Sequence, residues 1–334
     1  MDKKIYAKLH SIGAYIPEKV ISNEDLSKLV ETSDEWITKR TGIKERRFAK
    51  ASEAASDLAT QAAKIAIQRA GITPSEIDMI IVATISPDFL CMPSTACVVA
   101  CNLGIVGKPA FDISAACSGF IYLLALAKSF IESQTYKNIL IIGAEKLSSI
   151  LDMQDRNTCV LFGDGAGAAV ITSTKEKDLA ILDINIASNG QYQDFLITPG
   201  CGSRHPSSYE MLAQRMQFIK MKGNETFKIA VKTLSNDVVE ILARNKLTQK
   251  DIDYFIPHQA NLRIISAVGE SLNLPQEKIA LTIYKYGNTS AASIPMAIND
   301  FYEKGKIKTG SLLLLDAFGG GFTWGSALVH FGGD

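Results

Sequence analysis

The sequence predicts an α/β fold built from two similar halves, because segments of its first half recur in order in its second half. Ile72-Thr-Pro-Ser-Glu-Ile-Asp-Met-Ile-Ile resembles Leu247-Thr-Gln-Lys-Asp-Ile-Asp-Tyr-Phe-Ile, 175 positions later. Asn138-Ile-Leu-Ile-Ile-Gly-Ala-Glu resembles Ser311-Leu-Leu-Leu-Leu-Asp-Ala-Phe at 173 positions, and Gly167-Ala-Ala-Val-Ile resembles Gly325-Ser-Ala-Leu-Val at 158. Three matches in the same order, at about half the chain length, indicate an internal duplication.

Within each half, helix-like and strand-like segments alternate. In the first half we expect helices at 57–70 and 118–131 and strands at 77–83, 110–113 and 139–143; in the second, helices at 226–244 and 294–304 and strands at 254–256 and 311–317. Strands that are apolar on both faces and separated by helices predict sheets covered on both sides. We place the boundary between residues 173 and 174. Residues 176–223, rich in Gly and Pro, read as long loops around pieces of strand.

Composition narrows the class of protein. The 334 residues carry 35 Lys and Arg against 35 Asp and Glu, and 47% are hydrophobic. A chain this apolar is not disordered, and without a basic excess it is not built mainly to bind nucleic acid. The N-terminus lacks the apolar core of a signal peptide, and no apolar run is long enough to span a membrane. Six Cys without metal-ligand spacing, and four isolated His, favour a cytoplasmic enzyme with mostly free thiols and no metal.

Cys117 differs from the other cysteines in its position. It follows the strand at 110–113 and the small residues Ser114-Ala-Ala, and it precedes the helix at 118–131. A thiol at a strand-to-helix turn lies beside free N–H groups and the positive end of the helix dipole, and both favour the thiolate. Cys117 is therefore a candidate nucleophile, and a small buried hydrophobe is the alternative.

The other five cysteines fit that alternative better. Cys97 and Cys101 lie four residues apart on one face of an apolar helix, and Cys159 lies in an apolar segment. Cys91 and Cys201 lie in loops, and none of the five is directly followed by a helix N-terminus.

His258 and Asn288 are the candidate partners of the thiol. His258 follows the strand at 254–256, and the carboxyl ends of strands are where α/β folds hold their chemistry. Asn288 lies in a Gly-containing turn before a helix, 171 positions after Cys117, so the repeat brings the two turns together. A satisfied core histidine and a helix N-cap are the alternatives.

A dinucleotide fingerprint at Gly163-Asp-Gly-Ala-Gly-Ala is rejected. The spacing fits G-x-G-x-x-[G/A], but the fingerprint requires a helix to follow it. Here Ala169-Val-Ile-Thr follows, which reads as a strand.

Four segments together resemble the β-ketoacyl-acyl carrier protein synthase III family. They are Ala115-Ala-Cys-Ser-Gly-Phe, Pro257-His-Gln-Ala-Asn, Gly287-Asn-Thr-Ser-Ala-Ala-Ser and Phe322-Thr-Trp-Gly-Ser. The resemblance runs nearly end to end and implies the thiolase fold, with two similar halves in α-β-α-β-α layers. Chain-elongating condensing enzymes resemble Cys-His-His and thiolases carry a second Cys near the C-terminus, whereas this chain has Asn288 and no such Cys.

The resemblance implies a decarboxylative condensation that starts fatty-acid synthesis. Cys117 would take an acyl group, with acetyl the favoured primer, from an acyl-CoA, and malonyl-acyl carrier protein would then lose CO2 and attack the thioester. His258 and Asn288 would stabilise the enolate, and the backbone N–H groups of Cys117 and Gly320 would form the oxyanion hole. No cofactor is implied, because the coenzyme A thioester is a substrate.

The resemblance also implies where the substrates bind. Trp36 and Arg156 would sandwich the adenine, and Thr32, at a capping-box spacing from Glu35, would hold the nucleotide with Arg40. Gly223, Phe227 and Asn261 would line the pantetheine tunnel. Lys228 and Arg263 would contact the carrier protein.

Met92 is a departure from the family, in which an aromatic residue is frequent at the floor of the partner subunit's acyl pocket. A flexible thioether shapes a pocket less firmly than a ring, so longer or branched primers become possible. The homodimer is implied by the resemblance alone. Two other functions stay open: a related condensing enzyme that makes a signal or secondary metabolite, and a non-catalytic member that binds acyl-CoA.

Overall fold

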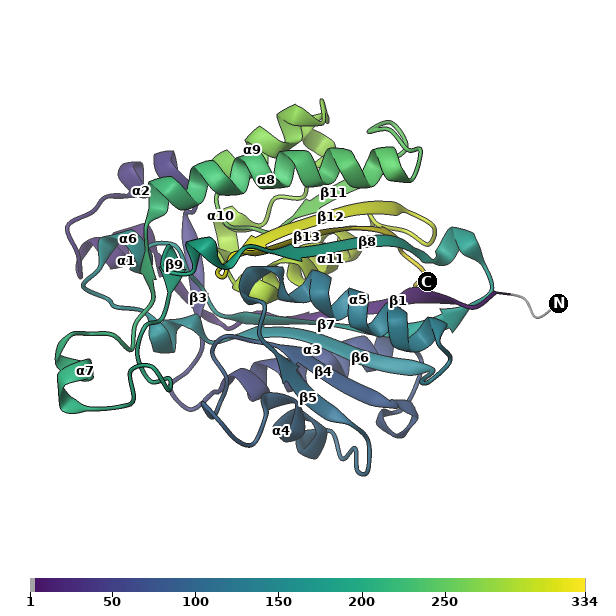
Figure 1. The fold of residues 1–334 in the computed structure, drawn as a ribbon, viewed down its shortest axis with the longest axis horizontal. Coiled ribbons are helices and arrows are strands. Elements are labelled where there is room, and N and C mark those ends of the chain that lie inside the picture. Colours follow the sequence, from purple (N-terminus) through teal and green to yellow (C-terminus); the bar gives the residue numbers. More distant parts are fainter. Residues whose placement is uncertain (1–3, 334) are drawn as a thin grey trace.

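The computed structural model describes residues 4–333, which form two central β-sheets and three layers of helices (Figure 1). The first sheet has the strand order β1-β7-β6-β4-β5. These strands are β1 (Tyr6–Tyr15), β7 (Gly165–Thr174), β6 (Asn138–Glu145), β4 (Met79–Ala83) and β5 (Ala110–Ile113). Strand β4 runs parallel to β5 and β6, whereas β7 is antiparallel to both of its neighbours.

The second sheet repeats this plan with four strands in the order β11-β12-β13-β8. They are β11 (Tyr254–Pro257), β12 (Leu312–Gly319), β13 (Thr323–His330) and β8 (Ile181–Ser188). Strands β11 and β12 are parallel and the other pairs are antiparallel, as in the first sheet. At the place of a fifth strand, an isolated parallel bridge joins Phe255 to Ile279. The predicted duplication is therefore visible in the topology, while the boundary at residues 173 and 174 stays a prediction.

Two helices lie between the sheets and form the middle layer. They are α5 (Gly119–Glu132) and α11 (Ser293–Glu303). The apolar residues of both helices pack against the inward side chains of both sheets and form one core. The outer layers are α3 (Ala55–Arg69) with α4 (Thr95–Asn102) on the first sheet and α8 (Gly223–Arg244) with α9 (Leu262–Ser271) on the second. Figure 1 shows these layers, and the predicted α-β-α-β-α arrangement is confirmed.

Smaller elements surround one end of the layers. The short helices are α1 (Asn23–Ser27), α2 (Asp34–Thr41), α6 (Arg156–Cys159), α7 (Tyr209–Ala213) and α10 (Ile283–Tyr286), and the short strands are β2 (Lys19–Ser22), β3 (Glu45–Phe48), β9 (Leu196–Ile197) and β10 (Lys220–Met221). Residues 176–223 hold the long loops that the Gly and Pro content predicts, but they also supply β8, a full strand of the second sheet. Among residues 4–333, no helix is both long and apolar enough to cross a membrane.

The repeat is most regular where the two middle helices begin. A 3-10 turn, η2 (Ala116–Ser118), leads into α5, and η7 (Ser290–Ala292) leads into α11 at the corresponding place. Ala116 and Ser290 both have left-handed backbone angles, with φ of 46° and 48°. Cys117 and Asn288 therefore do lie at corresponding turns, although in this register the counterpart of Cys117 is Ala291.

Candidate active site

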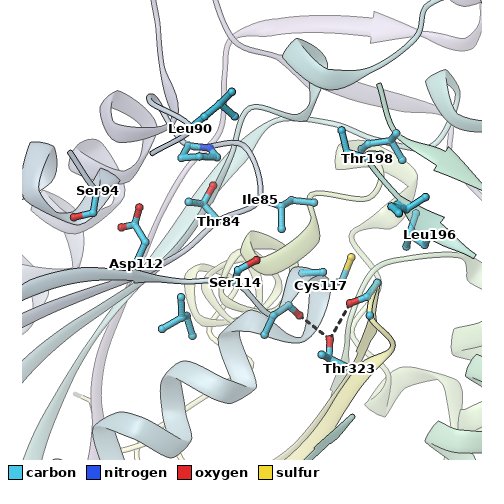
Figure 2. A pocket seen from close by; sticks show the side chains of 18 of the residues that line it. Thr84, Ile85, Leu90, Ser94, Asp112, Ser114, Cys117, Leu196, Thr198 and Thr323 are labelled. Carbon is cyan, nitrogen blue, oxygen red and sulfur yellow. Dashed lines mark hydrogen bonds between the residues drawn. The ribbon is translucent and has the colours of Figure 1, made fainter. Parts of the chain in front are cut away.

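Cys117 lies in the turn η2, between the end of β5 and the start of α5. The Thr323 hydroxyl of β13 donates to Ala115 O at 2.9 Å and ties this turn to the second sheet (Figure 2). Strand β12 passes so close that a Cβ atom on Gly319 would lie 2.6 Å from Cys117 N. A glycine at 319 is thus required for the two halves of the chain to meet at the thiol.

Burial dominates the chemistry of the Cys117 thiol. Its side chain is only 4% exposed, and desolvation raises its pKa to about 12. Burial works against the expectation that the helix N-terminus favours the thiolate, because loss of solvent penalises the charged form. The thiol is neutral, and its proton has to leave when the sulfur attacks.

His258 follows β11 and is held through its backbone and through its ring. Its backbone N–H donates to Asp316 O at 2.8 Å, and its Nδ1 lies 2.6 Å from Ser293 Oγ at the start of α11. Its Nε2 is buried and has no hydrogen-bond partner within the protein. Burial lowers the pKa of the imidazole to about 3, so the ring is neutral.

Asn288 is fixed through its backbone and through its amide. Its N–H donates to Leu161 O and its carbonyl accepts from Gly163 N–H, both at 2.9 Å. Its Oδ1 accepts from Ser290 N–H at 2.9 Å, so the side chain is used in a turn and Nδ2 is left as the donor. Asn288 does not cap a helix, and that alternative is wrong.

Two cavities meet at Cys117, and an outer groove adjoins one of them. A groove of about 650 Å³ is bordered by Trp36, Arg40, Lys228 and Arg263, and it shares Gly223, Phe227 and Asn261 with a narrower cavity of about 100 Å³. Cys117, His258 and Asn288 together line that narrow cavity. It leads to a third, of about 920 Å³, into which the Cys117 sulfur points beside Leu196 in Figure 2. The arrangement is a tunnel with a thiol, an imidazole and an amide side chain at its inner end.

Two of the residues predicted to hold a nucleotide, Trp36 and Arg40, line the outer groove, and Arg156 stacks on Trp36. The Arg40 and Arg156 guanidinium groups lie over the Trp36 ring, 4.8 and 4.7 Å from its centroid. Thr32 does not line the groove, and the predicted capping box at Thr32 is wrong. Ser33 is the N-cap of α2, because its side chain accepts from Trp36 N–H.

The remaining predicted residues fall on both sides of the tunnel. Asn261 caps α9 and donates to Arg40 O at 3.1 Å, while the Arg263 guanidinium stacks 4.8 Å from the centre of the Phe227 ring. Gly320 lines the large cavity beside Cys117. Met92, on the loop before α4, is 81% exposed and does not line its own chain's cavity.

Of the five cysteines assigned to the protein interior, one is buried and four are not. All six thiols are free, as expected, and Cys159 is buried. Cys91, Cys97 and Cys101 are exposed and Cys201 is half-buried, so the interior assignment is wrong for these four. For Cys97 and Cys101 the cause is that α4 covers the first sheet with its opposite face, through Ala96, Val99 and Ala100.

The rejected dinucleotide motif is a strand, as predicted, and it has a packing role. Residues from Gly165 onward form β7. A Cβ atom on Gly163 would lie 2.4 Å from Tyr286 O, and one on Gly167 would lie 2.6 Å from Pro295 Cβ. The glycines let this segment pack against the turn that carries Asn288 and the first residues of α11.

Sequence reasoning missed three polar residues beside the site: Glu145, Ser290 and Ser293. Both serines lie in the quoted segment that begins at Gly287, and Glu145 ends one of the repeated strands. Position in those motifs was the available signal. Among the described residues, no three His, Cys, Asp or Glu side chains gather to hold a metal ion.

Comparison with known proteins agrees with this architecture. The models of 3-oxoacyl-[acyl-carrier-protein] synthase III and of its C-terminal part match residues 111–190 and 242–331. The β-ketoacyl-[acyl-carrier-protein] synthase III of Helicobacter hepaticus is 65% identical over 99% of both chains, and that of Aliarcobacter butzleri is 62% identical over 98% of both.

Solved structures give the same result. The 3-oxoacyl-[acyl-carrier-protein] synthase III of Aquifex aeolicus superposes with a TM-score of 0.89 at 48% identity, covering 97% of this chain and 99% of that one. The Thermus thermophilus synthase III gives 0.90 at 40% identity, over 98% and 100% of the two chains. With relatives this similar along its whole length, the chain belongs to the 3-oxoacyl-[acyl-carrier-protein] synthase III family and has its thiolase fold.

Proposed function

We propose that this enzyme, an acyltransferase, condenses an acyl-CoA primer, preferably acetyl-CoA, with malonyl-acyl carrier protein. The products are CO2, CoA and a 3-oxoacyl-acyl carrier protein that initiates fatty-acid synthesis. The observation that carries the proposal is the meeting of one buried thiol and two neutral donor side chains at the inner end of a tunnel. A protein that only bound acyl-CoA would need none of the three.

The first step transfers the acyl group to Cys117. The sulfur attacks the thioester carbon, and the backbone N–H groups of Cys117 and Gly320 stabilise the oxyanion. Burial of the site strengthens these donors because the surrounding dielectric is low. CoA leaves through the tunnel, and the acyl chain points into the large cavity beyond Cys117.

The second step needs a place for negative charge on the enolate of the decarboxylated malonyl group. His258 Nε2 and Asn288 Nδ2 are donors that their other contacts leave free, and the low pKa of His258 keeps the ring neutral. They stabilise the enolate oxygen while its carbon attacks the Cys117 thioester. These residues suffice for the chemistry without a cofactor.

The outer groove binds the carrier of each substrate in turn. Trp36 and Arg156 stack on adenine, with Arg40 at the nucleotide end. Gly223, Phe227 and Asn261 line the passage for the pantetheine arm, and Lys228 and Arg263 attract an acidic carrier protein to its mouth.

The enzyme acts as a cytoplasmic homodimer in this proposal. Six free thiols fit a reducing compartment. The exposed loop around Met92 reaches into the large cavity of the partner subunit and closes its far end. A second candidate function, condensation with longer or branched primers, is favoured by the size of that cavity, about 920 Å³, and by the flexible Met92 at its floor.

Intact-protein mass spectrometry tests the proposal. The protein is incubated briefly with acetyl-, isobutyryl- or octanoyl-CoA, alongside Cys117→Ala, and the acylated peptide is mapped. We expect the mass gain of one acyl group on Cys117, largest with acetyl-CoA, and none in the variant. Preference for octanoyl-CoA would favour the second candidate, and no gain from any donor would overturn both.

A further inference from the structure

Glu145 is a buried carboxyl for which the steps above have no use. It ends β6 and is fully buried. It accepts from Ser86 Oγ at 2.6 Å, Ile85 N at 3.1 Å and Thr84 Oγ1 at 3.2 Å, all from the segment after β4. These donors are neutral, and burial raises the pKa of the carboxyl to about 7. Glu145 can therefore gain or lose a proton at physiological pH.

Ser290 lies between this carboxyl and the nucleophile. The turn η7 packs against β6, where a Cβ atom on Gly143 would lie 2.3 Å from Ala291 O, and against α5, where one on Gly119 would lie 3.1 Å from Ala291 Cβ. The Ser290 hydroxyl lies where it lowers the pKa of both the Cys117 thiol and the Glu145 carboxyl. It is buried without a hydrogen bond of standard geometry, and its residue has a strained φ of 48°. A strained residue with an unsatisfied buried hydroxyl is typical of a functional site.

The acyl transfer requires a proton acceptor that His258 does not provide. The Cys117 thiol is neutral and has to lose its proton as the S–C bond forms. His258 Nδ1 is occupied by its contact with the Ser293 hydroxyl, which leaves Nε2 as the ring nitrogen without a partner in the protein. The ring also resists protonation, with its pKa near 3. Another group has to accept the thiol proton.

We propose that Ser290 relays the Cys117 thiol proton to the Glu145 carboxylate during acyl transfer, and that the same path returns it after condensation. As sulfur bonds to the acyl carbon, the thiol proton moves to Ser290 Oγ and the Ser290 proton to Glu145. The C–S bond to CoA breaks, and the CoA thiolate takes a proton from water. When the enolate carbon bonds to the acyl carbon and Cys117 leaves, Glu145 returns its proton through Ser290 to the thiolate.

Few titratable groups face Glu145. Cys117 faces it from η2, whereas Thr84, Ser86 and Ser290 contribute hydroxyls that do not titrate in this range. Lys146 is next in the chain, but its Nζ turns away to the carbonyls of Lys50 and Glu53. The pH dependence of acylation near 7 is therefore assigned to Glu145.

The experiment measures single-turnover acylation of Cys117 by acetyl-CoA from pH 5.5 to 9, by quenched flow and mass spectrometry. The relay rests on the proposed function, so wild-type acylation at Cys117 is established first. In the wild type we expect the rate to rise through about pH 7. Glu145→Gln and Ser290→Ala should lower it about a hundredfold and remove this rise. Thr84→Val keeps the carboxyl but removes a donor to its charged form, so it should move the midpoint to higher pH.

A second readout separates the relay from a structural role. Decarboxylation of malonyl-acyl carrier protein is measured in Cys117→Ala, with and without Glu145→Gln, because this step needs no thiol proton. Equal decarboxylation by the two proteins supports the relay. A parallel loss of decarboxylation and acylation in Glu145→Gln, or a midpoint near 7 retained in that variant, would overturn it. Failure of wild-type Cys117 to become acylated would instead overturn the proposed function.

Discussion

Ser293 Oγ lies 2.6 Å from His258 Nδ1, at the point where α11 begins. The same oxygen accepts from Gln259 N–H at 3.4 Å, and its own proton can be donated to the imidazole. The ring proton is then on Nε2, the atom that faces the tunnel without a partner in the protein. With its hydroxyl donating to Nδ1, a serine outside the reacting groups stabilises the tautomer that can donate to an enolate.

Ser293→Ala should therefore impair the second step more than the first. Without the hydroxyl, both neutral tautomers of His258 become accessible and Nε2 is no longer always a donor. We expect decarboxylation of malonyl-acyl carrier protein to fall about tenfold, the equivalent of one hydrogen bond of ordinary strength. Acylation of Cys117 by acetyl-CoA, measured separately, should change less than twofold. Ser129→Ala, on the exposed face of α5, is the matched control, and equal loss of both steps in Ser293→Ala would contradict the tautomer argument.

His258→Ala and Asn288→Ala should show the same division with larger effects. Each removes one preorganised donor from the enolate, and loss of such a donor costs about 2.7–4 kcal/mol of barrier. We expect condensation to fall roughly a hundredfold to a thousandfold while acyl transfer to Cys117 persists. The two rates are measured in separate half-reactions. Variants that lost acyl transfer to the same degree would show that these side chains act on the thiol instead.

Much of this site could be predicted from sequence, because its residues end repeated strands or begin repeated helices. Cys117, His258 and Asn288 do line one cavity, as the repeat and the resemblance indicated. The raised pKa of Cys117 could not be predicted. The position of the thiol before a helix favours the thiolate, and only burial in the folded chain opposes it. The N-cap of α2 was misplaced by one residue, because Thr32 and Ser33 are adjacent and either side chain can cap.

Glu145 was missed for a related reason. In the sequence it is one acidic residue at the end of an apolar strand, and the aligned residue of the second half is Phe318. What distinguishes it is three donors from a segment about 60 residues earlier and a turn about 145 residues later. Contacts at that separation arise from topology and leave no local pattern.

Replacing Glu145 by Gln should also change how the folded state responds to pH. The pKa of Glu145 is raised from 4.5 to about 7, so the folded protein binds this proton more tightly than the unfolded chain. The resulting stability is fully present below pH 4.5 and is lost as pH rises through 7, in total about 3 kcal/mol. Glu145→Gln has no proton to lose, so its Tm relative to wild type should increase between pH 4.5 and pH 8. A constant difference in Tm across this range would contradict the raised pKa.

Arg156→Ala should weaken CoA binding and change the fluorescence of Trp36. The guanidinium lies 4.7 Å from the Trp36 ring centroid. An incoming adenine therefore has to displace the guanidinium from the ring and insert between the two groups. Loss of this cation–π partner should raise the KM for acetyl-CoA about tenfold and leave kcat within twofold. Trp324→Phe leaves Trp36 as the single tryptophan, and CoA titration of that variant should quench its emission. An unchanged KM in Arg156→Ala would remove Arg156 from the nucleotide site.

Met92→Phe tests whether this loop sets primer size. Met92 is 81% exposed and lies outside the cavity of its own chain, so an effect on primer choice requires that it act on a partner subunit. A phenyl ring is larger in cross-section and has fewer rotatable bonds than the thioether, so it should shorten the cavity of about 920 Å³. We expect kcat/KM for isobutyryl-CoA to fall about tenfold relative to that for acetyl-CoA, the discrimination that a change of one or two methylenes supports in an apolar pocket.

Val106→Phe, at another exposed loop position, is the matched control and should leave the ratio unchanged. An unchanged ratio in Met92→Phe, with sedimentation showing a dimer, would mean that the loop does not close the partner's pocket.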